Sequence, residues 1–188
     1  IFALLFLIAL TVFQSFYTVP AESGGVVIRF GRYHDQVDSG LRFKVPFIDD
    51  VILVPVKRQL KQEFGFDSGS IPIQSTRRSR SRSRKRNPYE SKDGYRSASE
   101  ITQEQNMVTG DLNAAQVEWV VQYRITDPKD FLFKVRQPED TLRDLSESSM
   151  REVIGDRTVD EVITVGRQEI ESEVLSKLQK RCNEYELG

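Results

Sequence analysis

The first 13 residues of the chain are apolar at every position except Thr11, and polar side chains return only gradually after them. Uncharged sequence continues to Val19, and at about 1.5 Å per helical residue it would reach roughly 28 Å, close to the thickness of a bilayer core. The pattern therefore predicts a transmembrane helix over residues 1–19, which Pro20 ends. Because the chain does not begin with Met, we expect its natural N-terminus to lie further upstream.

Aromatic residues at the end of this apolar segment fall where an interfacial belt would lie. A cleaved signal peptide or a buried core helix are the alternatives, since a strict count of 13 apolar residues is short for a membrane span. The charges that follow do not determine the orientation in the membrane. The side chains expected to anchor the chain are Phe2, Leu4, Leu5, Phe6, Leu7, Ile8, Leu10, Val12, Phe13, Phe16 and Tyr17.

Short alternating segments follow and predict β-strands. The clearest alternation is in residues 117–125, where apolar and polar positions take turns, as in a half-buried strand of an antiparallel sheet. Pro55 indicates that its strand lies at an edge or contains a bulge. The other predicted strands are at residues 26–30, 40–47, 51–56 and 60–66.

The period lengthens to that of helices after Asp127 and Pro128. A first helix is predicted from Pro138 to Gly155, because proline suits a first helical position and glycine follows a last one. Thr158 and Glu161 form a capping box, which predicts a second, longer helix running to about Tyr185. Its apolar stripe could bind a partner, but core packing is the favoured interpretation. The stripe consists of Val159, Val162, Ile163, Ile170, Val174 and Leu178, continued by Cys182. Strands followed by helices predict an α+β fold.

A stretch of different composition, residues 67–104, separates the two strand regions. It is rich in serine and basic residues and lacks apolar periodicity, so we expect a flexible insertion that cannot bury enough surface to order itself. The length of 188 residues favours a single domain with appendages. The expected organisation is a membrane segment at 1–19, two halves of one domain at 20–66 and 105–188, and the insertion between them, with truncation expected after Gly188.

The balance of 27 basic against 28 acidic residues hides one basic run, since seven of the basic residues lie at positions 77–86. Such a run attracts phosphates on anionic lipid or nucleic acid. No aromatic residue interrupts it, so base stacking is not indicated, and a solvated linker is the alternative. The candidate anionic-surface contacts are Arg77, Arg78, Arg80, Arg82, Arg84, Lys85 and Arg86.

Few residues could support catalysis or metal binding. The only cysteine, Cys182, excludes a disulfide framework, and the only histidine, His34, excludes a multi-histidine metal site. His34 is predicted in a hairpin loop, and a membrane-anchored hydrolase that uses it is a minor alternative. Asp49 and Asp50 are adjacent and would point in different directions in an extended segment, so we interpret them as turn and strand-start residues. We expect no catalytic residue, no metal and no cofactor.

Five segments in order resemble proteins of the band 7, or SPFH, family. The first, residues 22–32, reads ESGGVVIRFGR, and the second, residues 40–49, reads GLRFKVPFID. The others are MVTGDLN at 107–113, VQYRITDP at 121–128 and REVIG at 151–155. Each motif alone is weak, but their order over nearly the whole chain identifies it as a member of the family.

The resemblance implies a membrane-anchored scaffold that is not an enzyme. It implies assembly into rings or cages with a second, related subunit, control of an FtsH-like membrane protease, and organisation of a membrane microdomain. The expected location is the bacterial inner membrane, crossed once, with the domain outside the cytoplasm. Two features depart from the family: the basic insertion, and the absence from this sequence of the coiled coil that follows the domain. The alternative function is a peripheral module that uses the basic run to bind anionic lipid or nucleic acid, although nucleic acid is not an expected partner.

Overall fold

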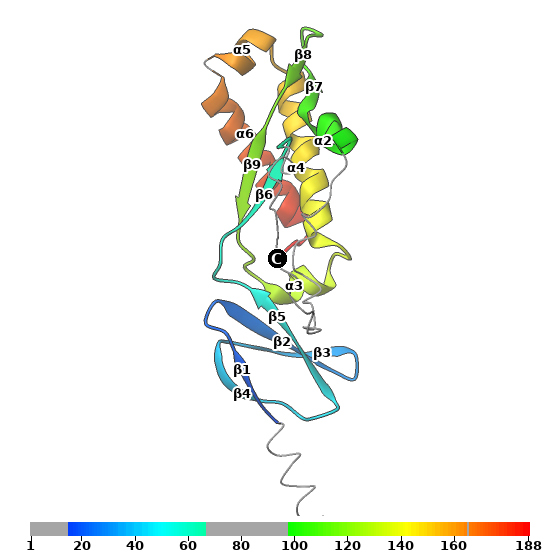
Figure 1. Cartoon of the computed structure of the whole chain (residues 1–188), viewed down its shortest axis with the longest axis vertical. Helices are drawn as coiled ribbons and strands as arrows, with labels where there is room; N and C mark the ends of the chain where they lie inside the picture. The colour runs from blue at the N-terminus through cyan, green and yellow to red at the C-terminus, as the bar shows by residue number, and fades with distance from the viewer. Residues whose placement is uncertain (1–14, 67–97, 165) are drawn as a thin grey trace, which may run out of the picture. The chain divides into compact units, whose positions relative to one another are not determined.

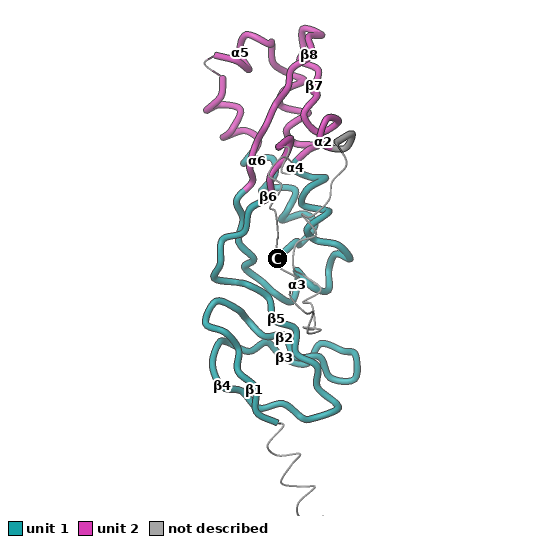
Figure 2. The backbone as a smooth tube through the Cα atoms, in the orientation of Figure 1, with its two compact units in different colours: residues 1–61, 122–146, 175–188 teal, residues 62–121, 147–174 magenta. Residues whose placement is uncertain are grey.

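The computed structural model describes residues 15–66, 98–164 and 166–188 (Figure 1). The chain divides into two compact units, where the length predicted one domain (Figure 2). Unit 1 comprises residues 1–61, 122–146 and 175–188, and unit 2 comprises residues 62–121 and 147–174. Each unit is therefore built from segments far apart in the sequence.

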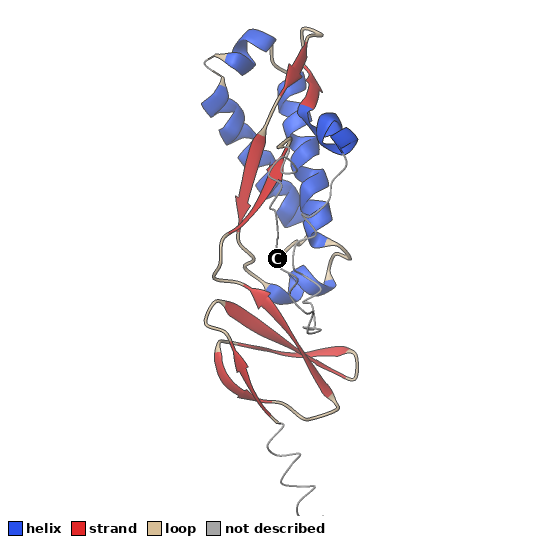
Figure 3. Ribbon diagram, in the orientation of Figure 1, coloured by secondary structure: helices blue, strands red, loops and turns tan. Residues whose placement is uncertain are grey.

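Unit 1 contains two small antiparallel sheets (Figure 3). One pairs β1 (Phe16–Val19) with β4 (Gly40–Phe43), and the other has the strand order β3-β2-β5. The three strands of the second sheet are β2 (Ser23–Arg29), β3 (Arg32–Val37) and β5 (Asp49–Pro55). The strands predicted around residues 26–30 and 51–56 are confirmed, while the one predicted at 40–47 is a strand only over Gly40–Phe43. Strand β5 lies at an edge of its sheet, as Pro55 indicated.

Close packing in unit 1 centres on the middle strand β2. Val26 is fully buried there, and Val54 of β5 is fully buried beside it in the same sheet. A Cβ atom on Gly25 would lie only 2.8 Å from Cγ2 of Val37, so glycine is needed where β3 approaches. The short helix α3 (Pro128–Phe133) belongs to the same unit, and Asp127 caps it by accepting backbone N–H bonds at its start.

Unit 2 contains the main hydrophobic core. Its strands belong to two pairs, β6 (Leu60–Phe64) with β9 (Trp119–Tyr123), and β7 (Asn106–Val108) antiparallel with β8 (Ala114–Gln116). The predicted alternation around β9 is confirmed, because Trp119 is buried while Glu118 and Val120 are exposed. The buried cluster consists of Phe64, Met107, Trp119, Met150, Val153, Ile154, Ile170 and Val174.

The helix predicted from Pro138 to Gly155 is confirmed as α4 (Pro138–Gly155). Leu142, Met150, Val153 and Ile154 of this helix are buried. Ser146 and Ser149 of α4 are also fully buried, which the pattern of apolar residues did not indicate.

The single long helix predicted after Thr158 is wrong. The capping box is present, but it opens only the short helix α5 (Val159–Ile163), and α6 (Arg167–Glu184) follows as a separate helix. Thr164 leaves helical geometry at φ −102° and ψ −100°, and the backbone N–H of Gly166 returns to the carbonyl of Glu161 at 3.0 Å. As a result Ile163, predicted to lie on a buried stripe, is exposed.

The predicted N-terminal helix is wrong over its last four residues. Phe16–Val19 form strand β1, because phenylalanine, tyrosine, threonine and valine favour strands and β4 provides the pairing partner. Residues 1–14 lie outside the described part of the chain. Of the helices the structure does describe, none is both long and apolar enough to cross a membrane.

The stretch predicted to be flexible contains a helix at its C-terminal end. Ala98–Gln105 form helix α2, within the stretch expected to be flexible. The Gln105 carbonyl accepts a hydrogen bond from the backbone N–H of Val117 at 3.0 Å, which ties the helix end to the strand region. Residues 67–97, including the whole basic run, lie outside the described ranges.

Candidate functional site

Two turns of unit 1 each present an exposed phenylalanine from a strained backbone. Phe30, in the turn between β2 and β3, has φ +51° and is 79% exposed. Phe47, in the loop between β4 and β5, has φ +67° and is 93% exposed. Left-handed backbone costs a non-glycine residue roughly 1–2 kcal/mol, and both rings lie in water. Neither feature stabilises the fold, so the two rings call for a functional explanation.

An ion pair joins the bases of these two turns. Arg29, the last residue of β2, donates from Nε to Oδ1 of Asp49 at 2.7 Å and from Nη2 to Oδ2 at 2.9 Å. Asp49 begins β5, and its Oδ2 also accepts the backbone N–H of Val45 at 2.9 Å. The backbone N–H of Phe30 reaches the carbonyl of Ile48 at 3.4 Å. The two turns are therefore neighbours in space.

The Asp49 carboxylate is held in its charged form. Hydrogen bonding to Arg29 is the main cause that lowers the pKa of Asp49 from 3.8 to about 2, against the opposing effect of burial. The same hydrogen bond raises the pKa of Arg29. The pair thus stays ionised at neutral pH, in the bidentate geometry that makes arginine–carboxylate pairs strong.

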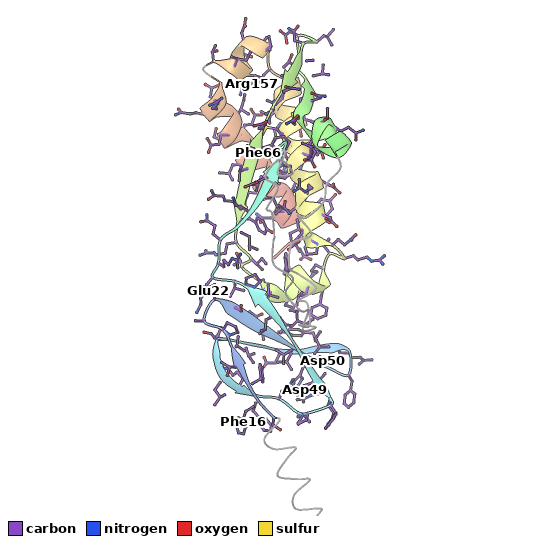
Figure 4. The ribbon with its side chains drawn as sticks, viewed as in Figure 1. Phe16, Glu22, Asp49, Asp50, Phe66 and Arg157 are labelled. Atoms are coloured by element: carbon purple, nitrogen blue, oxygen red, sulfur yellow. The ribbon has the colours of Figure 1, made fainter. Side chains whose placement is uncertain are left out.

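The paired strands β1 and β4 also carry exposed apolar side chains. Phe16 of β1 and Phe43 of β4 face each other across the pair, with ring centroids 5.9 Å apart in an edge-to-face contact, and both are exposed. The backbone N–H of Lys44 bonds to the carbonyl of Ser15 at 2.8 Å, and this joins the start of β1 to the Phe47 loop. We use the term apolar surface for the exposed apolar side chains of these strands and turns, which are Phe16, Phe30, Leu41, Phe43, Phe47 and Ile48 (Phe16 and Asp49 are labelled in Figure 4).

The arrangement suits contact with an apolar medium. The surface lies on connected backbone, and the 13-residue apolar segment directly precedes its first strand in the chain. Lys44 lies at its margin, with its ammonium 5.9 Å from the centre of the Tyr17 ring. Aromatic and lysine side chains together are typical of the boundary between lipid and water.

The residues considered for chemistry do not form a hydrogen-bonded pair in the described contacts, although His34 contributes a minor electrostatic effect that lowers the pKa of Asp49. His34 lies on strand β3 rather than in the predicted hairpin loop, exposed, at a shift in the register with β2. Asp49 is buried and Asp50 is exposed, so the two adjacent carboxyl groups diverge as predicted (Figure 4). Within the described ranges, no three His, Cys, Asp or Glu side chains gather to hold a metal ion.

Two groups of predicted site residues remain predictions. The anchor side chains from Phe2 to Phe13 and the basic run from Arg77 to Arg86 lie outside the described residues. Of the anchor residues that are described, Phe16 points into solvent and Tyr17 is half-buried on β1.

Sequence reasoning missed the two exposed turns. Phe30 and Phe47 were noted only as part of the family-like segments and not as exposed residues. The contact between Arg29 and Asp49 joins residues 20 positions apart in the sequence. The available signal was an aromatic residue directly beside a turn-forming Gly31 or Pro46, where a polar residue would be usual.

A model of the SPFH domain / Band 7 family matches residues 17–188. Protein HflK of Borreliella burgdorferi is 33% identical over 184 residues, which cover 98% of this chain and 52% of that protein. Protein HflK of Treponema pallidum is 35% identical over 168 residues, 87% of this chain and 45% of that protein. The modulator of FtsH protease HflK of Escherichia coli is 31% identical over 175 residues, 93% of this chain and 32% of that protein. The chain spans about half or less of the length of these relatives.

Proposed function

Because this chain belongs to the SPFH domain / Band 7 family, we propose that it is a membrane-anchored, HflK-like regulatory subunit that controls an FtsH-like membrane protease without catalysis of its own. The relative from Escherichia coli is named a modulator of FtsH protease, which supports this role. The match of the family model to residues 17–188 is consistent with it.

The observation that carries the proposal is the apolar surface of unit 1. We propose that it rests in the lipid–water boundary, beside an anchor formed by residues 1–13. Burying one phenylalanine side chain contributes about 2 kcal/mol, so Phe30 and Phe47 together would favour the bilayer strongly enough to fix the orientation of the unit. The strain at both turns is then offset by a contact that exists only at the membrane.

The wider assembly follows the same proposal. Copies of the chain would join an HflC-like subunit in a hetero-oligomeric scaffold in the bacterial inner membrane, each crossing it once with the SPFH domain on the extracytoplasmic side. Such a scaffold would enclose the protease, organise a membrane microdomain and decide which substrates reach the active site. Its stabilising contacts would come from neighbouring copies and lipid, with no cofactor involved.

A cell-based degradation assay tests this function. The rate at which the FtsH-like protease degrades a membrane substrate is measured in a strain that lacks the chain and in strains that carry variants of it. We expect Phe30→Ser with Phe47→Ser to behave like the missing chain, and the exposed control Ile163→Ser to behave like the wild type. Equal rates with and without the chain would overturn the proposal.

The basic run supports a second candidate function, a peripheral module that contacts anionic lipid. Seven basic residues in ten positions would attract the phosphate groups of anionic lipid. The run contains no aromatic residue, so it gives no indication of base stacking. This function could operate beside the first, because the run lies in an insertion outside the family motifs.

A further inference from the structure

The Arg29–Asp49 ion pair carries an inference that rests on the proposed function and deepens it. We infer that Arg29 and Asp49 are positioning residues, which hold the Phe30 turn and the Phe47 loop as one unit so that both rings enter the bilayer boundary together. Neither residue needs to touch lipid for this role.

The Asp49 carboxylate accepts three hydrogen bonds. Its Oδ1 and Oδ2 take both prongs of the Arg29 guanidinium, and Oδ2 also takes the backbone N–H of Val45. Two backbone bonds close the same loop, from Asp49 N to the Val45 carbonyl at 3.0 Å and from Ile48 N to the Val45 carbonyl at 3.4 Å. The Phe47 loop is therefore closed on itself and fastened to the end of β2, one residue before Phe30.

Backbone strain explains why such a fastening is needed. Phe30 and Phe47 both occupy the left-handed region, which a free turn with a bulky side chain leaves readily. A surrounding structure that over-determines the backbone is what keeps such residues in place. The β2–β5 ladder already pairs the backbones of Arg29 and Asp49, and the Arg29 fork adds a side-chain link that spans both turns.

Burial and charge also suit a position beside lipid. The Asp49 side chain is only 2% exposed, while the side chain of Arg29 is 36% exposed. A carboxylate or guanidinium left unpaired next to an apolar medium is costly, whereas a bidentate pair with a third hydrogen bond satisfies much of both groups. The Arg29–Asp49 pair can therefore lie close to the Phe30 and Phe47 rings without a large cost of desolvation when the rings enter the bilayer boundary.

The test uses the full chain reconstituted in liposomes whose lipids carry bromine on the acyl chains, which quench nearby tryptophan. The natural Trp119 is replaced by phenylalanine, and Phe47→Trp or Phe30→Trp provides the reporter. Asp49→Asn removes the fork, and Asp50→Asn, the exposed neighbour on β5, is the matched control. Circular dichroism shows whether the sheets persist.

We expect both reporters to be quenched, and Asp49→Asn to reduce the quenching of both by more than half while Asp50→Asn changes neither. If Asp49→Asn loses its sheet signal, Arg29→Lys replaces it, because lysine keeps the charge and lacks the fork; a partial loss at both reporters is then expected. If the folded variant, Asp49→Asn or its replacement Arg29→Lys, leaves the quenching unchanged or reduces it at only one reporter, the positioning role is overturned while the proposed membrane contact stands. Reporters that are not quenched in the starting protein overturn the proposed membrane contact itself.

Discussion

Phe64 of β6 stacks on Trp119 of β9 with ring centroids 4.6 Å apart and planes inclined by only 9°. The two residues stand on either side of the insertion in the sequence, and both are buried in the core of unit 2. Their contact joins strands that residues 67–97 separate, so the insertion leaves the core of this unit intact.

Removing this contact should damage unit 2. Phe64→Ala leaves a cavity against Trp119, and we expect the free energy of unfolding to fall by about 3–5 kcal/mol. Phe66→Ala is the matched control, because Phe66 is 39% exposed and its loss should cost much less. Chemical denaturation followed by Trp119 fluorescence compares the two, and equal losses would contradict the stacking role.

The capping box should contribute to stability although it opens only a short helix. Thr158 Oγ1 accepts the backbone N–H of Glu161 at 3.4 Å, and the Glu161 carboxylate accepts the backbone N–H of Thr158 at 2.9 Å. We expect Thr158→Ala to lower the free energy of unfolding by about 1 kcal/mol, and Thr158→Ser to preserve it. A serine variant as unstable as the alanine variant would indicate packing of the threonine methyl group instead.

Gly110 should tolerate no side chain. A Cβ atom there would lie 2.8 Å from the carbonyl oxygen of Gly155 and 3.3 Å from that of Arg157, both backbone atoms. We expect Gly110→Ala to cost about 1–3 kcal/mol, since the chain must shift. Gly24→Ala is the control, because its nearest neighbour would be 3.5 Å away at an ordinary contact distance. Thermal unfolding of both variants checks the difference.

Acid should weaken unit 1 through Asp49. Its pKa is lowered in the fold from 3.8 to about 2, so the stabilisation it gives is fully present above the unfolded value and is lost as pH falls toward the folded one. We expect the free energy of unfolding to decline between pH about 5 and about 2, with a shallower decline for Asp49→Asn. Identical acid profiles for the two proteins would contradict the ion pair's contribution.

The basic run should bind anionic vesicles in a salt-dependent manner. We expect deletion of residues 77–86 to weaken that binding and to flatten its dependence on salt, because counterion release follows the number of phosphate contacts. Sedimentation with phosphatidylglycerol vesicles measures both effects. Neutral vesicles are the control, and unchanged binding to anionic vesicles would remove this candidate function.

Local patterns predicted most elements because local forces determine them. The alternation around Trp119, the start of α4 at Pro138 and the capping box at Thr158 each depend on residues a few positions apart. The prediction of one long helix failed because the apolar spacing continues across the break between α5 and α6. The turn at Gly166 is set by its backbone hydrogen bond to Glu161. The first strand was not predicted because Phe16–Val19 adjoins an apolar run. Its pairing partner, β4, is evident only from the folded structure.

The candidate site was predicted only in part for a related reason. Its apolar character could be anticipated from Phe16 and the segment before it. The turns that expose Phe30 and Phe47 are joined by Arg29 and Asp49, which are distant in sequence. Alternation assigns phenylalanine to a core, and only the folded turns reveal that both rings face outward. The two compact units were hidden as well, since their segments alternate along the chain.

Co-purification from mild detergent tests the central claim most directly. The chain, within its full-length protein, is tagged and extracted from the bacterial membrane, and the extract is separated by size. The account predicts a large assembly that contains an FtsH-like protease and a second SPFH subunit. A strictly monomeric protein that brings down neither of them would contradict it.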